Sequence, residues 1–360
     1  MNAGLEDVVA ASTVLSDVDG KNGRLIIRGS SLDDLVANAR YENVLALLFA
    51  GFFPQTPSLP AALGAARAEI FDHLTAVDPT LLTLPPVDAM RALLARLDDG
   101  DDLSAALRLV AAPAVFIPAL LRLKAGKSAI APQPASSHAA DTLRMMTGDI
   151  PSPEQTAALD RYLVTVADHG LNASTFAARV VASTRAGLTS SVLAALSALK
   201  GPLHGGAPGP VLDMLDAAAT PDNAPNWIAA ELARGERLMG FGHRVYRVRD
   251  PRADALKSAV RLLAGAGAID LARLALAEAV ERTALDQLKA KKPDRPLDTN
   301  VEFYTALLLE ALGFPRQAFT GVFAMGRVGG WIAHAREQAE TGRLIRPRSL
   351  YIGPQPQAAA

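Results

Sequence analysis

Residues 152–170 read Ser-Pro-Glu-Gln-Thr-Ala-Ala-Leu-Asp-Arg-Tyr-Leu-Val-Thr-Val-Ala-Asp-His-Gly, and this stretch predicts the helical character of the whole fold. Ser152, the Pro after it and Gln155 together form a capping-box start. Apolar side chains then recur at helical spacing from Leu159 to Val166. Gly170 is expected to end this helix.

Helical periodicity continues on the C-terminal side of this stretch. The segment from Phe176 to Gly187 predicts a following helix that begins at Asn172 or Ser174. His169 therefore falls at a helix end or junction, where a polar side chain can face a neighbouring element.

Strand signals are scarce and concentrate near the N-terminus. Gly20-Lys21-Asn22-Gly23 separates Val18-Asp19 from Arg24-Leu25-Ile26-Ile27-Arg28, which predicts one small hairpin. Asp17-Val18-Asp19-Gly20 is not a calcium loop, because Lys21 takes the third acidic ligand position and the required Gly is displaced.

Composition narrows the class of protein. The chain has 360 residues, 50% of them hydrophobic, which is enough for a large core in one large or two unequal domains. A formal net charge of −1 argues against nucleic acid or a membrane surface as a partner. The absence of cysteine excludes disulfides, thiolate metal sites and cysteine nucleophiles. We expect a cytoplasmic enzyme without a metal.

Two stretches of the sequence indicate whether the protein is secreted or inserted into a membrane. Met1–Ser12 carries acidic residues and lacks the basic and apolar regions of a signal peptide. The apolar run Leu109–Leu121 is expected to be interrupted by Pro113 and Pro118, to be too short to cross a bilayer, and to lie in the core.

Three motifs in the second half carry titratable side chains beside glycine, proline or a helix start. Gly-Pro-Leu-His204-Gly-Gly and Gly-Phe-Gly-His243 each place a histidine beside glycines. The second motif continues to Asp-Pro-Arg252, which supplies a cation, and the third, Thr-Asn-Val-Glu302, supplies a carboxylate. Two imidazoles can polarise two carbonyl oxygens, a carboxylate can remove a proton from carbon, and arginine can bind a carboxylate. This set suits an aldol or Claisen-type condensation.

These motifs, in this order and spacing, closely resemble the signature regions of the citrate synthase family. The resemblance covers nearly the whole chain. It includes Ser16–Gly20, Asp168–Ser174 and Trp331–His334 as well as the three motifs, while residues 60–140 match only in general character. It implies an all-α, two-domain fold with a small N-terminal hairpin. It also implies a large domain formed by residues 1–205 and 314–360, with a small domain at 206–313.

The resemblance implies a role for each catalytic residue. His204 would donate a hydrogen bond to the thioester carbonyl of acetyl-CoA, while Glu302 removes a methyl proton. His243 would polarise the ketone of oxaloacetate, and citryl-CoA would then be hydrolysed to citrate and CoA. The usual base of the family is Asp, and the residue after His169 is usually Glu, so Glu302 and Gly170 are departures.

The resemblance also implies how the substrates are held. Oxaloacetate would bind His169, Arg252 and Arg327, together with Arg346 from the partner subunit of a homodimer with shared active sites. No cofactor would be bound permanently, because acetyl-CoA is a co-substrate. The coenzyme would contact the backbone of Met239, Gly240, Phe241 and Gly242. The basic residues Lys289, Lys291, Lys292 and Arg295 either bind its phosphates or form a solvated face.

Three functions remain open at this point. Citrate synthase is the first, and 2-methylcitrate synthase, which uses propionyl-CoA, differs from it by one methylene, worth about 1–3 kcal/mol in a pocket. A weakly active or non-catalytic paralogue is the third, because Glu302 replaces the usual Asp. The retained histidines and arginines argue against the third.

Overall fold

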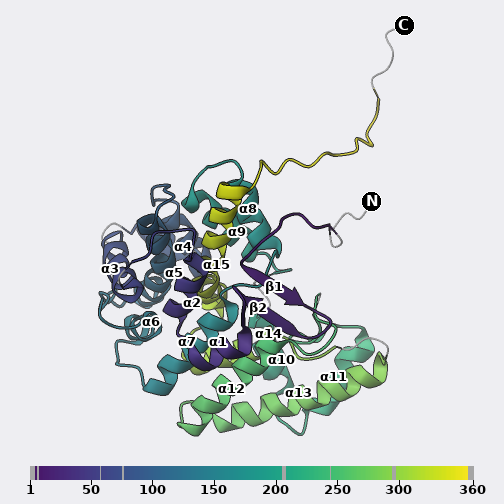
Figure 1. Ribbon diagram of the computed structural model, residues 1–360. Helices are drawn as coiled ribbons and strands as arrows, with labels where there is room; N and C mark the ends of the chain where they lie inside the picture. Colours follow the sequence, from purple (N-terminus) through teal and green to yellow (C-terminus); the bar gives the residue numbers. More distant parts are fainter. Residues whose placement is uncertain are drawn as a thin grey trace.

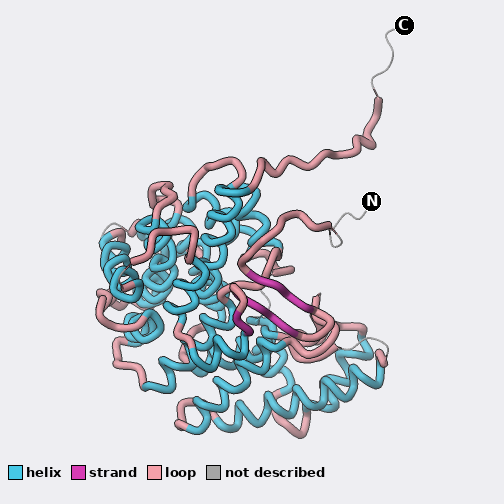
Figure 2. The backbone as a smooth tube through the Cα atoms, in the orientation of Figure 1, coloured by secondary structure: helices cyan, strands magenta, loops and turns pink. Residues whose placement is uncertain are grey.

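The computed structural model describes residue 5 and residues 8–56, 58–74, 77–204, 208–243, 245–293 and 297–355. Within these residues, Figure 1 and Figure 2 show a body built from helices and one small antiparallel sheet. The predicted all-α fold with an N-terminal hairpin is confirmed. The elements are β1 (Ser16–Asp19), β2 (Arg24–Ile27), β3 (Ser30–Ser31), α1 (Leu32–Asn38), α2 (Tyr41–Phe49), α3 (Leu59–Asp72), η1 (Pro79–Thr83), α4 (Pro86–Leu94), α5 (Leu103–Lys124), α6 (His138–Thr147), α7 (Pro153–Val166), α8 (Ala173–Ala182), α9 (Leu188–Leu199), α10 (Pro208–Ala218), α11 (Ala224–Arg234), α12 (Pro251–Gly265), α13 (Leu271–Lys291), α14 (Val301–Ala311), η2 (Arg316–Ala318) and α15 (Phe319–Thr341).

The hairpin forms where the sequence predicts it. β1 pairs antiparallel with β2 in the register Asp19↔Arg24, and β2 pairs with the short β3 through Ile27↔Ser30. The side chain of Asp19 accepts hydrogen bonds from the backbone N–H groups of Lys21 and Asn22, both at 3.1 Å. These bonds fix the turn locally, as Asp commonly does.

The capping box of α7 is present. The Ser152 hydroxyl accepts from the N–H of Gln155 at 3.2 Å, and the Gln155 side chain accepts from the N–H of Ser152 at 2.9 Å. The helix ends at Val166, so the predicted end at Gly170 is wrong. The chain leaves the helix early because the buried Asp168 turns to partners outside it.

Helix α5 runs unbroken through Pro113 and Pro118, so the predicted interruption is wrong. A proline removes one backbone donor from a helix and kinks it, and burial on all sides compensates here. The apolar run is predicted to be too short to cross a bilayer, but the 22-residue helix that contains it is long and apolar enough; 83% of its most apolar part is buried inside the protein. It is a core helix, as predicted.

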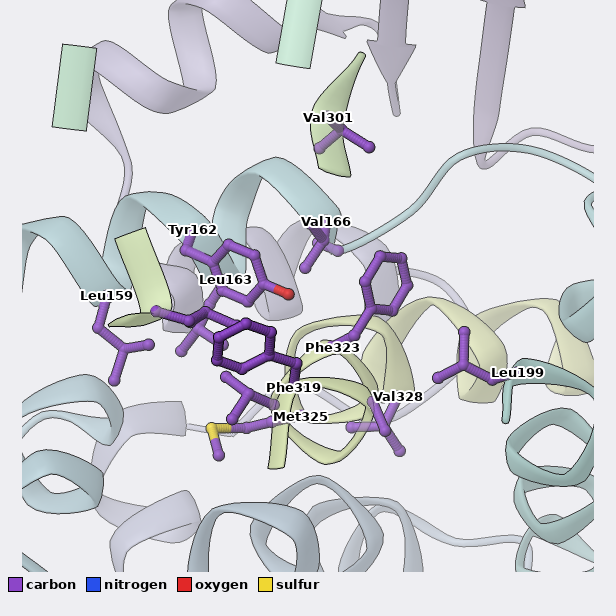
Figure 3. Packing of buried hydrophobic residues seen from close by; sticks show 14 of the residues in the cluster. Leu159, Tyr162, Leu163, Val166, Leu199, Val301, Phe319, Phe323, Met325 and Val328 are labelled. Carbon is purple, nitrogen blue, oxygen red and sulfur yellow. The ribbon is translucent and has the colours of Figure 1, made fainter. Parts of the chain in front are cut away.

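The core on which the site rests lies between α7 and α15. Figure 3 shows Tyr162 and Val166 of α7 facing Phe319 and Phe323 of α15, with Val301 of α14 nearby. The glycines of α15 allow this close approach. A Cβ at Gly326, Gly329 or Gly330 would overlap atoms of Val166, Leu45 and Ala167, respectively. Helix α15 therefore packs closely against its neighbours on both sides of Arg327.

Candidate active site

His169 lies in the short connection between α7 and α8. Its side chain is buried, and its Nε2 lies 3.1 Å from the hydroxyl oxygen of Tyr246. Its ring centroid is 5.6 Å from that of His243, a residue far along the chain. Burial, reinforced by the nearby Arg252 and Arg327, holds the pKa of His169 well below its usual value, so the ring is neutral.

His204 lies in the turn after α9 and is half-buried. Its Nε2 is 2.9 Å from the hydroxyl oxygen of Ser174 on α8. Burial, followed by the charges of Arg327 and Arg252, lowers the pKa of His204 to about 4. A neutral imidazole carries one proton, so only one of its nitrogens can donate.

The Ser174 hydroxyl, which the sequence argument did not assign to the site, decides which nitrogen that is. Its oxygen accepts from Trp331 Nε1 at 3.2 Å and lies 2.7 Å from Asn172 Oδ1. The hydroxyl has one proton, which in this structure it donates to Asn172 Oδ1; the alternative is to donate it to His204 Nε2. Only the second arrangement places the proton of His204 on Nδ1, where it can donate to a ligand.

His243 follows two glycines that both adopt left-handed backbone, with φ of +86° at Gly240 and +80° at Gly242. Around them, the N–H of Gly242 donates to the Asp298 carbonyl at 2.7 Å, and the N–H of Asn300 donates to the Gly240 carbonyl at 3.0 Å. These bonds join the His243 loop to the segment that leads into α14.

Both ring nitrogens of His243 face N–H groups. Nδ1 accepts from the N–H of Val245 at 2.9 Å and of Tyr246 at 3.0 Å, while Nε2 lies 3.1 Å from Arg252 Nη2. Burial and then Arg252 lower the pKa of His243 to about 4. Two N–H groups face Nδ1 and one faces Nε2, so we infer that the single proton of the neutral ring lies on Nε2, in place of a hydrogen bond from Arg252 Nη2. His243 Nε2 and Arg252 Nη2 are 3.1 Å apart, so one ligand oxygen placed beside them can accept a hydrogen bond from both.

Arg252 is buried at the start of α12 and forms a two-point ion pair with Asp250. Its Nε and Nη2 lie 3.0 and 2.8 Å from the two carboxylate oxygens. Asp250 also accepts from the N–H of Val301 at 3.2 Å. One carboxylate thus ties the first turn of α12 to the first turn of α14, which brings Arg252 and Glu302 to the same place.

Glu302 lies in the first turn of α14, whose N-cap is Asn300. Its side chain is half-buried. Burial raises the pKa of the Glu302 carboxyl, against the opposing effect of Arg252 and with support from Asp250. A carboxylate with a raised pKa is a stronger base than one in water.

Arg327 is buried in α15, with 1% of the residue exposed. Its Nε donates to the Val166 carbonyl at 2.5 Å, and its Cζ lies 4.9 Å from the centroid of the Phe323 ring. Its Nη2 has no hydrogen-bond partner among the described residues. Burial lowers its pKa to about 10, so the group stays charged. A buried cation with a free donor is suited to binding a carboxylate.

The other predicted residues lie differently. Arg346 is exposed on the C-terminal segment, which runs away from the body in Figure 1, so it does not join this site within one chain. Gly240 and Gly242 have packing reasons of their own, because a Cβ there would crowd Phe303 and Leu297 at 2.9 and 2.8 Å. Phe241 is buried, while the half-buried Met239 lines a groove of about 240 Å³. Coenzyme contact by Met239–Gly242 stays a prediction.

Some residues of these motifs fall outside the described part of the chain. They are Gly205, Gly206, Arg244 and, in the basic segment, Arg295. The boundary predicted between 205 and 206 falls there as well.

A second buried carboxylate, Glu281 of α13, holds the segment before Glu302. It accepts from the hydroxyls of Thr299 at 2.8 Å and Tyr304 at 2.6 Å, and from Lys257 Nζ at 2.6 Å. These bonds outweigh burial and lower the pKa of Glu281. Nothing in the local sequence marks this residue, because its partners lie on three different elements.

Taken together, the described residues place three neutral imidazoles, a half-buried carboxylate and two buried guanidinium groups around one region. This arrangement can hold a dianion, donate hydrogen bonds to two carbonyl oxygens and remove a proton from carbon. No cluster of three or more His, Asp or Glu side chains suited to a metal ion occurs among the described residues.

Comparisons with known proteins agree with this chemistry. The sequence model of the family "Citrate synthase, C-terminal domain" matches residues 4–348. The chain is 37% identical to the citrate synthase of Haloferax volcanii, over 98% of this chain and 96% of that one. It is 34% identical to a 2-methylcitrate synthase of Mycobacterium tuberculosis, over 97% and 90%.

A solved structure is similar over the whole fold. It is the citrate synthase of Thermoplasma acidophilum in a ternary complex with carboxymethyl coenzyme A and oxaloacetate. The TM-score is 0.86 at 28% identity, over 100% of this chain and 98% of that one.

Proposed function

Because this chain belongs to the citrate synthase family of acyltransferases, we propose that it condenses acetyl-CoA with oxaloacetate and water to give citrate and CoA. The observation that carries the proposal is the convergence of His243, Arg252 and Glu302, which Asp250 ties together. The cation-rich site suits a dicarboxylate, and the similar protein from Thermoplasma acidophilum binds oxaloacetate and a coenzyme A analogue.

In this proposal the acetyl group is activated by His204 and Glu302. The Nδ1–H of His204 donates to the thioester carbonyl, and the Glu302 carboxylate removes a methyl proton to give an enol or enolate. One preorganised donor of this kind contributes about 3–4 kcal/mol, and a general base about 10²- to 10⁴-fold. A thioester methyl group is so weak an acid that both are needed.

Oxaloacetate is held and polarised by the other residues. Arg252, Arg327 and His169 bind its carboxylates, and the Nε2–H of His243 donates to its ketone oxygen. The enol carbon attacks that ketone, His243 protonates the new alkoxide, and water then hydrolyses citryl-CoA. We propose that residues 206–313 close over residues 1–205 and 314–360 when the substrates bind.

The assay is release of free CoA thiol from purified protein with oxaloacetate and either acetyl-CoA or propionyl-CoA. We expect acetyl-CoA to give the higher kcat/KM. A higher value for propionyl-CoA would make the protein a 2-methylcitrate synthase, as the similarity to such an enzyme allows. If neither donor releases thiol, the remaining hypothesis is a non-catalytic paralogue. Full activity in the presence of a strong chelator is expected, because no metal takes part.

We further propose a cytoplasmic homodimer in which Arg346 completes the partner's site. The exposed position of Arg346 supports this, since the residue is free to cross an interface. Mixing inactive His204→Ala and inactive Arg346→Ala proteins under subunit exchange should restore partial activity, because one site of each hybrid is intact. Hybrids shown to form but without activity would refute the shared site.

A further inference from the structure

The N-terminal hairpin touches both halves of the proposed site, although the mechanism assigns it no part. At one end, the Ser16 hydroxyl donates to the carboxylate of Asp168 and accepts from the N–H of Gly170 at 3.1 Å. At the other end, the Gly20 carbonyl accepts from the N–H of Arg247 at 2.8 Å. The hairpin therefore spans from the His169 connection to the His243 loop.

The contact at Gly20 leaves no room for a side chain. A Cβ at Gly20 would overlap the carbonyl oxygen of Val245 and would lie 2.8 Å from its carbonyl carbon. The φ of Gly20 is not in the left-handed region, so glycine is needed here for space. Gly23 is similarly close, with a built Cβ 2.8 Å from Val248 Cγ2 and 3.0 Å from the Arg249 carbonyl oxygen.

Val245 connects the Gly20 turn to His243. Its N–H and that of Tyr246 are the two donors on Nδ1 of His243, at 2.9 and 3.0 Å. A shift of the Val245 peptide would remove these donors from Nδ1. The ring would then be free to carry its proton on Nδ1, which leaves Nε2 unable to donate.

We propose that the Gly20 turn is a positioning element of the active site, which seats the Val245–Tyr246 backbone and so fixes His243 with its proton on Nε2. The role assigned to His243 in polarising a ketone rests on the proposed function. The tautomer itself does not, since it is inferred from contacts of the protein alone, in which two backbone donors face Nδ1 and one donor, Arg252 Nη2, faces Nε2.

The main test is Gly20→Ala. Its kcat/KM for oxaloacetate should fall about 10- to 100-fold, as expected for a displacement approaching 1 Å. The KM for acetyl-CoA should stay within about twofold, because His243 does not bind the coenzyme. The matched controls are Lys21→Ala, whose side chain is exposed on the same turn, and Gly265→Ala, where a Cβ meets nothing within 4 Å. Both should behave as wild type.

The second readout is ¹⁵N NMR of the ligand-free protein labelled at its six histidines, with His243 assigned through His243→Gln. Wild type should show His243 protonated on Nε2, and Gly20→Ala should show a mixture of tautomers. Should Gly20→Ala not fold, Asp19→Ala loosens the same turn from a half-buried position and should shift the tautomer in the same direction.

The outcomes separate the two proposals. Wild-type tautomer and kinetics in both turn variants would overturn the positioning role, and so would lost activity with an unchanged His243 tautomer. A wild-type protein inactive with both acyl donors would remove the proposed function, and the NMR comparison alone would then decide the positioning role.

Discussion

The two sides of the site are built in different ways. His169 and Arg327 lie on or beside α7 and α15, whose backbones are in contact through glycines. His243, Arg252 and Glu302 lie on loops and first helical turns, which are held by single backbone bonds and by the carboxylates of Asp250 and Glu281. One side is fixed by packing and the other by hydrogen bonds.

This difference implies different costs of mutation. Overpacking a close-packed core typically costs 1–3 kcal/mol of stability, and the folded fraction keeps its site geometry. Displacing a hydrogen-bonded loop costs less stability, but a shift of about 1 Å can cost about 10²-fold in rate. Mutations on the packed side should therefore lower the free energy of unfolding, and mutations on the loop side should lower kcat.

The largest expected effect is at Glu302 on the loop side. Glu302→Gln should lower kcat about 10²- to 10⁴-fold with little change in oxaloacetate binding, because the amide cannot accept the proton while the arginines remain. Steady-state kinetics and calorimetric titration with oxaloacetate measure both quantities. Near-normal turnover by this variant would place the base elsewhere.

The matched change Glu302→Asp sharpens the same point. Where the surrounding chain is adapted to the longer side chain, shortening it leaves a gap and lowers kcat. Where it is not adapted, Asp restores the distance usual in the family and raises kcat. Either direction identifies Glu302 as the base, whereas no change in kcat contradicts that role.

The packed side is tested by Gly330→Ala. The new methyl would overlap the carbonyl oxygen of Ala167, so we expect a loss of about 1–3 kcal/mol in the free energy of unfolding. Denaturant titration measures it, with Gly265→Ala as the glycine control in open space. The kcat of the folded protein should change less than twofold. A large loss of kcat with an unchanged free energy of unfolding would contradict the distinction between a packed side and a hydrogen-bonded side.

A smaller effect is expected at Ser174, which joins the two sides through His204. Ser174→Ala removes the hydroxyl that contacts Nε2 of His204 at 2.9 Å and that would hold the proton of His204 on Nδ1 when it donates to Nε2, so kcat should fall roughly tenfold. Ser174→Thr keeps a hydroxyl and should retain more activity. Equal losses in both variants would indicate a packing role for Ser174.

The smallest effect concerns pH. The pKa of His204 is about 4 in the folded protein against 6.5 when unperturbed, so between these values the unfolded chain binds a proton that the folded protein does not. Stability should fall as pH falls from 6.5 towards 4, by at most about 1.4 kcal/mol per pH unit for this residue, and by less where solvent screens it. His204→Asn should show a shallower slope than wild type in denaturant titrations over this range. Identical slopes would contradict the lowered pKa.

The parts of this molecule that could be predicted from its sequence are those with local signals. The capping box at Ser152, the hairpin turn at Gly20–Gly23 and the helix start at Asn172 follow from neighbouring residues, and the structure contains all three. The course of α5 could not be predicted locally, because burial overrides the two prolines. The end of α7 depends on partners of Asp168 from distant parts of the chain.

The same distinction holds within the site. His169, His204, His243, Arg252, Glu302 and Arg327 were named through motifs and family resemblance. Ser174, Tyr246 and Glu281 were missed, because their relevance lies in contacts across 30, 77 and 18 residues of sequence. A sequence motif indicates which residues can react, whereas the residues that support them are identified only from contacts in the folded chain.

The free Nη2 of Arg327 has a consequence for the abundance of the protein. Because this buried donor has no hydrogen-bond partner among the described residues, the folded state lacks stability that a carboxylate would restore. A dicarboxylate bound there adds RT ln(1 + [L]/Kd), about 2.7 kcal/mol at a concentration 100 times Kd. Resistance to proteolysis in the cell would then rise and fall with the level of the substrate, so the metabolite would help set how much enzyme persists.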